Sequence, residues 1–159
     1  METSLLNLLI TNFITMRIVY EGMPKKVLII DDDLDLLMLL ERRLLQEGYD
    51  IETAASLPEA EEIIANFSPH LVLLDINVNG EDGRQLCWKL KKNAGKDIKV
   101  IIMSGYDYDT GRAVLFGADD LLPKPLHTEY LLHRMGSCLN VKPGEPDASS
   151  PFIFTHMKE

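Results

Sequence analysis

The chain has 159 residues and carries 16 Lys and Arg against 25 Asp and Glu, which gives a net charge of -9 at pH 7. Apolar residues make up 46% and charged residues 26%, the composition of a soluble globular protein long enough to bury a core. Because duplex binding depends on Lys and Arg, this balance argues against direct nucleic-acid binding, and no apolar run reaches the roughly 18 residues of a membrane span.

Cysteine and histidine usage argues against a structural zinc site. Cys87 and Cys138 lie far apart and outside any Cys-x-x-Cys or Cys/His cluster. Such isolated thiols are typical of a reducing compartment, so a cytoplasmic protein is expected. The four histidines also fit no metal-ligand spacing; they are His70, His127, His133 and His156.

Residues 1–24 form an N-terminal extension that allows two interpretations. Its apolar stretch is short, is interrupted by Asn and Thr, and follows Glu2 rather than basic residues, which argues against a secretory signal. The first interpretation is an amphipathic helix that contacts a partner or the following domain. The second is a segment outside the working protein, because "MPKKVLII" from Met23 is typical of a natural start.

From Lys25 the chain alternates apolar runs of strand length with amphipathic segments of helix length. The segment "KVLII" predicts the first strand, and leucines at helical spacing predict a helix over 34–47. A short alternating strand over 50–54 comes next. Ser56 and Glu59 have the spacing of a capping box, which predicts the start of a second helix.

The second half of the chain continues this alternation. "HLVLLD" predicts a strand buried on both faces, and a loop, "INVNGEDG", leads to a helix over 84–93. Further strands are expected at "IKVIIM" and "DDLLP", separated by a short helix around "RAVLF", and the last helix covers "HTEYLLHRMGSCL". Residues 140–159 are rich in Pro, Ser and Gly and predict a flexible tail too short for an output domain.

Alternating strands and helices predict the fold class. They indicate parallel β-α-β units, and hence an α/β domain over residues 25–139 with a doubly wound, five-stranded parallel sheet and helices on both faces. In such sheets, ligands bind at the carboxyl ends of the strands. The residues at those ends are therefore the candidate site.

Polar side chains stand at the ends of four of the five predicted strands. Asp31 and Asp32 follow the first strand, Asp75 ends the third, and Ser104 and Lys124 follow the fourth and fifth. Because parallel strands share one carboxyl edge, these groups are expected to converge. Clustered carboxylates suit Mg²⁺, and a carboxylate only partly neutralised by metal and lysine can act as a nucleophile toward phosphorus.

Four motifs occur in order within residues 25–139: "LIIDDD", "LVLLDINVNGEDG", "VIIMSGYD" and "GADDLLPKP". Together they resemble the response-regulator receiver domain, the CheY-like phosphoacceptor of two-component signalling. The resemblance implies a flavodoxin-like sheet with strand order 2-1-3-4-5. It also implies a phosphoacceptor switch rather than an enzyme, with a sensor histidine kinase or phosphotransfer protein as phosphoryl donor. The short tail predicts that this switch stands alone and acts on an unidentified downstream protein.

The resemblance implies a role for each acid at the strand ends. Asp75 accepts the phosphoryl group. Asp31, Asp32 and Asp75 hold Mg²⁺, with Asp31 acting through water, and the backbone carbonyl of Asn77 completes the protein's share of the metal ligands. Magnesium is thus the implied cofactor.

Two further residues receive roles from the resemblance. Ser104 hydrogen-bonds a phosphoryl oxygen after transfer. Lys124 pairs with Asp75 and then with the phosphoryl group, and its peptide bond to Pro125 is expected to be cis. Metal and ammonium neutralise charge on the transferring group, and the domain catalyses its own phosphorylation and slow hydrolysis.

The chain departs from the family pattern at several positions. Leu121 replaces the usual aromatic residue three positions before the lysine, which puts the usual aromatic switch in question. Asn79 replaces a common proline, so a looser loop is expected after the acceptor. The segment from Ser104 to Lys124 is short and contains Gly111, which predicts a clipped or frayed fourth helix. In the family, the positions two residues beyond the acceptor and two residues beyond the hydroxyl tune the lifetime of the phosphoryl group. Here these positions are Asn77 and Tyr106.

Two other functions remain as alternatives. The departures at Leu121 and Asn79 and the short fourth helix favour a phosphorylation-independent interaction module on the same fold. The segment "VLIIDDDL" also resembles haloacid-dehalogenase-type phosphohydrolases, in which Asp31 would attack and Asp33 would be the acid. That reading leaves Asp75 without a role, and Asp33 is expected to cap a helix instead.

Overall fold

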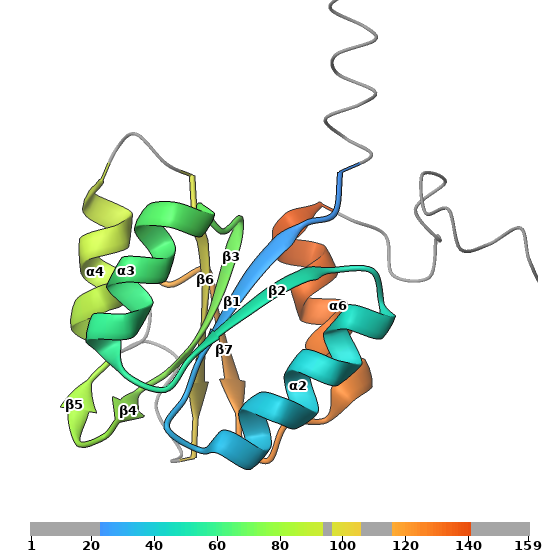
Figure 1. Ribbon diagram of the computed structural model, residues 1–159, viewed down its shortest axis with the longest axis horizontal. Helices are drawn as coiled ribbons and strands as arrows, with labels where there is room; N and C mark the ends of the chain where they lie inside the picture. The colour runs from blue at the N-terminus through green and yellow to red at the C-terminus, as the bar shows by residue number, and fades with distance from the viewer. Residues whose placement is uncertain (1–22, 94–96, 106–115, 141–159) are drawn as a thin grey trace, which may run out of the picture. The chain divides into compact units, whose positions relative to one another are not determined.

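The computed structural model describes residues 23–93, 97–105 and 116–140. A five-stranded parallel sheet lies at the centre of these residues (Figure 1). Its strands are β1 (Lys26–Ile30), β2 (Asp50–Ala54), β3 (Leu71–Asp75), β6 (Lys99–Ser104) and β7 (Asp120–Pro123). They follow the order β2-β1-β3-β6-β7, which is the 2-1-3-4-5 pattern that the sequence predicted. The predicted fold class is therefore confirmed.

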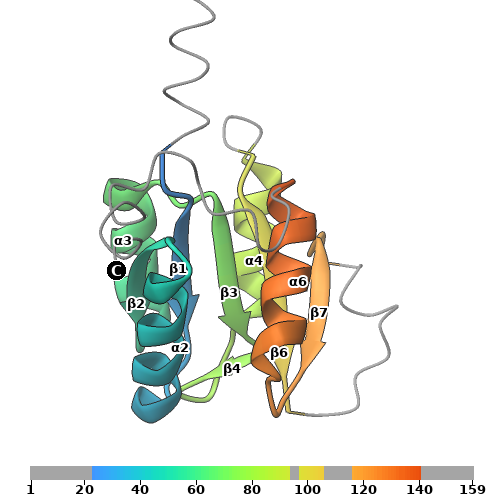
Figure 2. The ribbon, with the colours of Figure 1, turned by 90° about the vertical axis from the view of Figure 1, so that its right-hand side faces the viewer.

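Helices cover both faces of the sheet (Figure 1, Figure 2). The pair α2 (Leu34–Gln46) and α6 (Thr128–Leu139) lies on one face, and α3 (Leu57–Phe67) and α4 (Arg84–Lys92) lie on the other. Alternate residues of each strand point to opposite faces, so the sheet contributes to two separate apolar clusters. The α2 and α6 cluster includes Val27, Ile29, Leu37, Leu40, Leu44, Leu131 and Met135. The α3 and α4 cluster includes Leu28, Ile30, Ala60, Ile64, Leu86 and Cys87.

Side-chain caps fix the starts of the first two helices. The carboxylate of Asp33 accepts hydrogen bonds from two backbone N–H groups in the first turn of α2, so its predicted role as a helix cap is confirmed. Ser56 caps α3 by accepting from the backbone N–H of Glu59 at 3.4 Å. The Glu59 carboxylate, however, accepts from the N–H of Ala55 at 2.8 Å. The reciprocal bond of the predicted capping box therefore lies one residue earlier than expected.

The segment that follows β3 is more ordered than the loop predicted for it. It contains a two-stranded antiparallel hairpin, β4 (Asn77–Val78) and β5 (Glu81–Asp82). Asn79 and Gly80 join these strands with φ angles of +52° and +82°. Positive φ at both central residues is what a two-residue type I′ turn requires, and Asn-Gly is a favoured pair for it. The segment predicted as a loop therefore contains a regular hairpin, and the looser loop expected from Asn79 stays a prediction.

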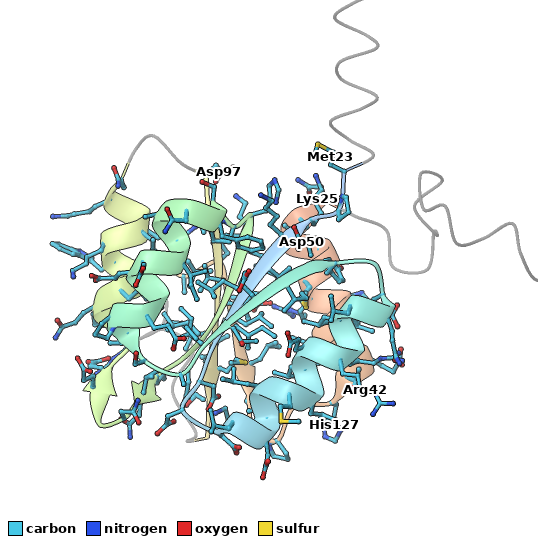
Figure 3. All side chains as sticks on the ribbon, viewed as in Figure 1. Met23, Lys25, Arg42, Asp50, Asp97 and His127 are labelled. Carbon is cyan, nitrogen blue, oxygen red and sulfur yellow. The ribbon has the colours of Figure 1, made fainter. Side chains whose placement is uncertain are left out.

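The parallel strands direct their carboxyl ends to one edge of the sheet. In Figure 3, Lys25, Asp50 and Asp97, which stand at or just before strand starts, lie at one end of the domain, whereas His127, which follows β7, lies at the other. The end that carries His127 is the carboxyl edge. The fold thus gathers the predicted site residues at a single edge.

Several predictions fall outside the described residues. They concern the helix in the extension up to residue 22, the short helix around "RAVLF", Gly111, Tyr106 and the tail from residue 141. Among the residues that the structure does describe, none of the helices is both long and apolar enough to cross a membrane.

His70 ties β1 to β3 at the end of the sheet opposite the candidate site. Its Nδ1 accepts a hydrogen bond from the backbone N–H of Lys26 at 2.9 Å. Burial lowers the pKa of the imidazole, and the charges of Lys25 and Lys26 lower it further. The folded chain therefore takes up a proton on His70 at a lower pH than the unfolded chain does.

This difference predicts a pH dependence of stability. As pH falls through the ordinary histidine pKa of about 6.5, the unfolded state binds a proton that His70 resists, so the free energy of unfolding falls until the pH reaches the lower folded pKa. His70→Asn keeps an acceptor for the Lys26 N–H but does not titrate. Urea unfolding between pH 7 and pH 5 should show a shallower loss of stability in this variant. Equal slopes in the two proteins would contradict the assignment.

Candidate functional site

Three carboxylates meet at the carboxyl edge of the sheet. Asp31 and Asp32 directly follow β1, and Asp75 is the last residue of β3. One carboxylate oxygen from each of the three lies within 4.8 Å of the other two. Asp31 is buried, with 1% of its surface exposed, while Asp32 is exposed and Asp75 is intermediate. The structure thus brings together the acids that the sequence predicted as neighbours.

Lys124, directly after β7, adds the positive charge of this cluster. Its Nζ lies 2.6 Å from Asp31 Oδ2 and 3.3 Å from Asp75 Oδ2. Its backbone N–H donates to the carbonyl oxygen of Ser104 at 2.6 Å, which holds the ends of β6 and β7 together. The peptide bond to Pro125 is cis, as the resemblance implied.

Burial and the charges of the cluster shift the pKa values of Asp75 and Lys124. Burial raises the pKa of the Asp75 carboxyl; the ammonium of Lys124 opposes this rise, and the negative charge of Asp31 adds to it. Burial alone would lower the pKa of Lys124, but its hydrogen bond to Asp31 and the charges of both carboxylates raise it above its ordinary value. The lysine is therefore held in its ammonium form beside Asp75.

A cavity of about 550 Å³ opens at this edge of the sheet. Its lining includes Asp32, Asp75, Asn77, Ser104 and Lys124. Ser104 is buried, with 2% of its surface exposed, and Asn77 is exposed at the start of β4. Asp31 does not line the cavity but contacts the lysine that does. The site residues that the sequence predicted therefore all line this cavity or contact a residue that does.

Gly83, just before α4, is a site residue that the sequence analysis did not identify. A Cβ atom at this position would overlap the backbone carbonyl oxygen of Asp75 and would lie 3.2 Å from Leu74 Cδ1. Its own N–H donates to the carbonyl of Ile76 at 2.7 Å. The absence of a side chain thus lets the start of α4 pack directly against the backbone of the central acid. The Asp-Gly pair that ends "LVLLDINVNGEDG" was the available signal.

An acid–base pair beside the cavity was also missed. The guanidinium of Arg84 donates to both carboxylate oxygens of Asp82, with Nε–Oδ1 and Nη2–Oδ2 distances of 2.8 and 2.7 Å. These hydrogen bonds lower the pKa of Asp82, although its burial opposes the shift. Asp82 is thus already paired with a cation of its own, whereas Asp31 and Asp75 share Lys124.

The central trio fits a divalent cation. Magnesium binds oxygen ligands, and three carboxylates whose oxygens lie within 4.8 Å of one another supply such a set. Like charges at this separation repel, and Lys124 offsets only part of that repulsion. The donor set, its position at the carboxyl edge and its exposure through Asp32 all suit Mg²⁺.

Comparison with known proteins defines the class of this domain. The family model described as the response regulator receiver domain matches residues 27–136, which is most of the chain. The chain therefore belongs to the response regulator receiver family, as the four sequence motifs indicated.

Individual relatives agree with this assignment. The chain is 35% identical over 133 residues to the response regulator MprA of Mycobacterium sp. (strain KMS), a match that covers 82% of this chain and 57% of that relative's length. Among solved structures, it is similar to the BeF3-activated N-terminal receiver domain of Klebsiella pneumoniae RstA, with 29% identity, a TM-score of 0.66, and coverage of 72% of this chain and 98% of the other. A CheY-like receiver domain protein from Methanospirillum hungatei is 32% identical, with a TM-score of 0.65 and coverage of 74% and 94%.

Proposed function

We propose that residues 25–139 form a phosphorylation-controlled switch in which Asp75 accepts a phosphoryl group from a phosphohistidine. The donor is a sensor histidine kinase or a phosphotransfer protein. The observation that carries the proposal is the position of Asp75, which lines the cavity, lies close to two other carboxylates and pairs with Lys124. The proposal concerns the receiver domain, because the chain spans 57% of the length of the curated relative that it matches.

The transfer is a nucleophilic substitution at phosphorus. A carboxylate oxygen of Asp75 attacks, an O–P bond forms, and the P–N bond to the donor histidine breaks, with its electron pair returning to the imidazole. Lys124, now 3.3 Å from the Asp75 carboxylate, pairs with the phosphoryl oxygens after transfer. Ser104 donates a hydrogen bond to one of those oxygens. Water attack on the acyl phosphate reverses the state slowly.

Asp31, Asp32, Asp75 and the backbone carbonyl of Asn77 would hold Mg²⁺ in this site. When bound, the ion neutralises negative charge on the transferring phosphoryl group. Asp32 and Asp75 would be the direct ligands, and Asp31 would act through water. The burial of Asp31 and its contact with Lys124 support this division of roles.

Phosphorylation would shift a two-state equilibrium of the domain and so change its affinity for a downstream protein. Leu121 bears on this step, because it lies in β7 at the usual aromatic position. It is partly buried against the apolar cluster under α3 and α4. A leucine packed at this position favours a conformational switch that does not depend on the movement of an aromatic side chain. The lack of this aromatic residue is also why the phosphorylation-independent module remains the second candidate.

Acetyl phosphate and Mg²⁺ distinguish the two candidates. The intact mass of the wild-type chain should rise by the mass of one phosphoryl group after incubation. Acetyl phosphate is a small molecule that can react at the receiver's own site without a kinase. Asp75→Asn, which lacks the nucleophilic oxygen, and the wild type in excess EDTA should stay unmodified. A wild-type chain that remains unmodified with Mg²⁺ present would favour the interaction module.

A further inference from the structure

The Asn-Gly turn of the β4–β5 hairpin contacts one acid of the central trio, Asp32, directly. The backbone N–H of Asn79 donates to Asp32 Oδ2 at 3.2 Å. The side-chain amide of the same residue donates through Nδ2 to the carbonyl oxygen of Ala55 at 2.7 Å. Asn79 therefore links the hairpin to the acid that follows β1 and to the segment that follows β2.

The anchor for the side-chain amide is itself fixed on several sides. Ala55 donates its N–H to the Glu59 carboxylate at 2.8 Å, which ties it to the first turn of α3. The preceding carbonyl, that of Ala54, accepts from the backbone N–H of Asp31 at 3.1 Å. The hairpin is thus attached to the segment at the end of β2, whose neighbouring carbonyl also holds the backbone of Asp31.

We infer that Asn79 is a positioning residue for the cation site, in that its side-chain amide holds the turn where its backbone N–H orients the carboxylate of Asp32. This inference rests on the proposed function. A carboxylate has two oxygens, so one can accept this hydrogen bond while the other binds a cation. Partners that orient metal-binding side chains raise affinity because the ligand no longer has to be ordered when the ion binds.

The residue type is matched to both contacts. The φ of +52° at Asn79 excludes proline, whose ring fixes φ near -65° and which has no N–H to donate to Asp32. Glycine adopts the same backbone conformation and retains the N–H but has no amide for Ala55. Asn79→Gly therefore removes the side-chain tether alone, and Asn79→Pro removes the tether, the turn geometry and the backbone donor together.

The test measures Mg²⁺ binding to the unphosphorylated full chain by isothermal titration calorimetry. Asn79→Gly should weaken Mg²⁺ affinity about tenfold, in the range for residues that orient metal ligands, and Asn79→Pro should weaken it further. Asn66→Ala is the matched control, because Asn66 also donates its amide to a backbone carbonyl, that of Glu62 in α3. The control should keep the wild-type affinity.

A second readout separates positioning from general stability. In EDTA, the unfolding midpoint of Asn79→Gly should fall only slightly, because glycine suits the turn and only one exposed hydrogen bond is lost, while the increase in midpoint caused by Mg²⁺ should be smaller. If the wild type binds Mg²⁺ and Asn79→Gly binds it equally tightly, this inference alone is overturned. If the wild type binds no Mg²⁺, the proposed function is overturned and this inference with it.

Discussion

Replacing Lys124 with methionine is expected to lower the free energy of unfolding by about 3 kcal/mol in the absence of Mg²⁺. Methionine keeps much of the aliphatic stem but removes the ammonium that lies 2.6 Å from Asp31. With 1% of its surface exposed, Asp31 would then be a buried carboxylate without its cation. Urea unfolding at pH 7 measures the loss.

Two further variants identify the cause of this loss. Lys89→Met removes a lysine whose partner, Glu61, lies at 2.8 Å but whose side chains are both about half exposed. Such surface pairs contribute at most about 1 kcal/mol, so this control should be nearly neutral. The double variant Lys124→Met with Asp31→Asn should recover most of the lost stability, since the fully buried carboxylate of Asp31 is no longer charged. A double variant no more stable than Lys124→Met would show that the ion pair is not the cause.

Gly83→Ala is expected to destabilise the domain by about 2–3 kcal/mol and to reduce phosphorylation of Asp75. The backbone of Gly83 has a φ of -59°, which alanine adopts freely, so conformational strain is not the reason. The added Cβ would overlap the carbonyl oxygen of Asp75 and force the end of β3 away from α4. Urea unfolding and the fraction of protein labelled by acetyl phosphate measure the two effects.

Gly105→Ala is the matched control for this steric effect. Gly105 lines the cavity, and a Cβ there would meet no atom of the described residues within 4 Å. Its free energy of unfolding should stay within about 0.5 kcal/mol of the wild type. If Gly83→Ala is as stable as Gly105→Ala, then β3 and α4 can move apart with no loss in the free energy of unfolding. That result would contradict a close contact between Gly83 and the backbone of Asp75.

The sheet and the strand-end acids could be predicted because both follow from local patterns. Apolar runs that alternate with amphipathic segments define parallel strands, and residues such as Asp75 and Lys124 occur directly at strand ends. The cap at Asp33 was predictable for the same reason, since capping depends on the residue and its immediate neighbours.

The hairpin and the contacts of Gly83 required the three-dimensional structure. Strands of two residues, as in β4 and β5, are too short to show an alternating pattern, although the Asn-Gly pair at 79–80 was a visible turn signal. Gly83 is constrained by the carbonyl of Asp75, and Asn79 by Asp32 and Ala55. Contacts of this kind depend on how elements pack, which residue type alone does not reveal.

The most direct test of the central claim is the chemical identity of the phosphorylated residue. Hydride reduction converts an aspartyl phosphate into an alcohol, which marks the acceptor permanently for peptide mass spectrometry. After incubation with acetyl phosphate and Mg²⁺, the reduced residue should be Asp75, in the peptide that contains "LVLLDINVNGEDG". Reduction at Asp31 instead would support the phosphohydrolase arrangement, and a chain without any reduced aspartate would contradict the account of Asp75 as a phosphoacceptor.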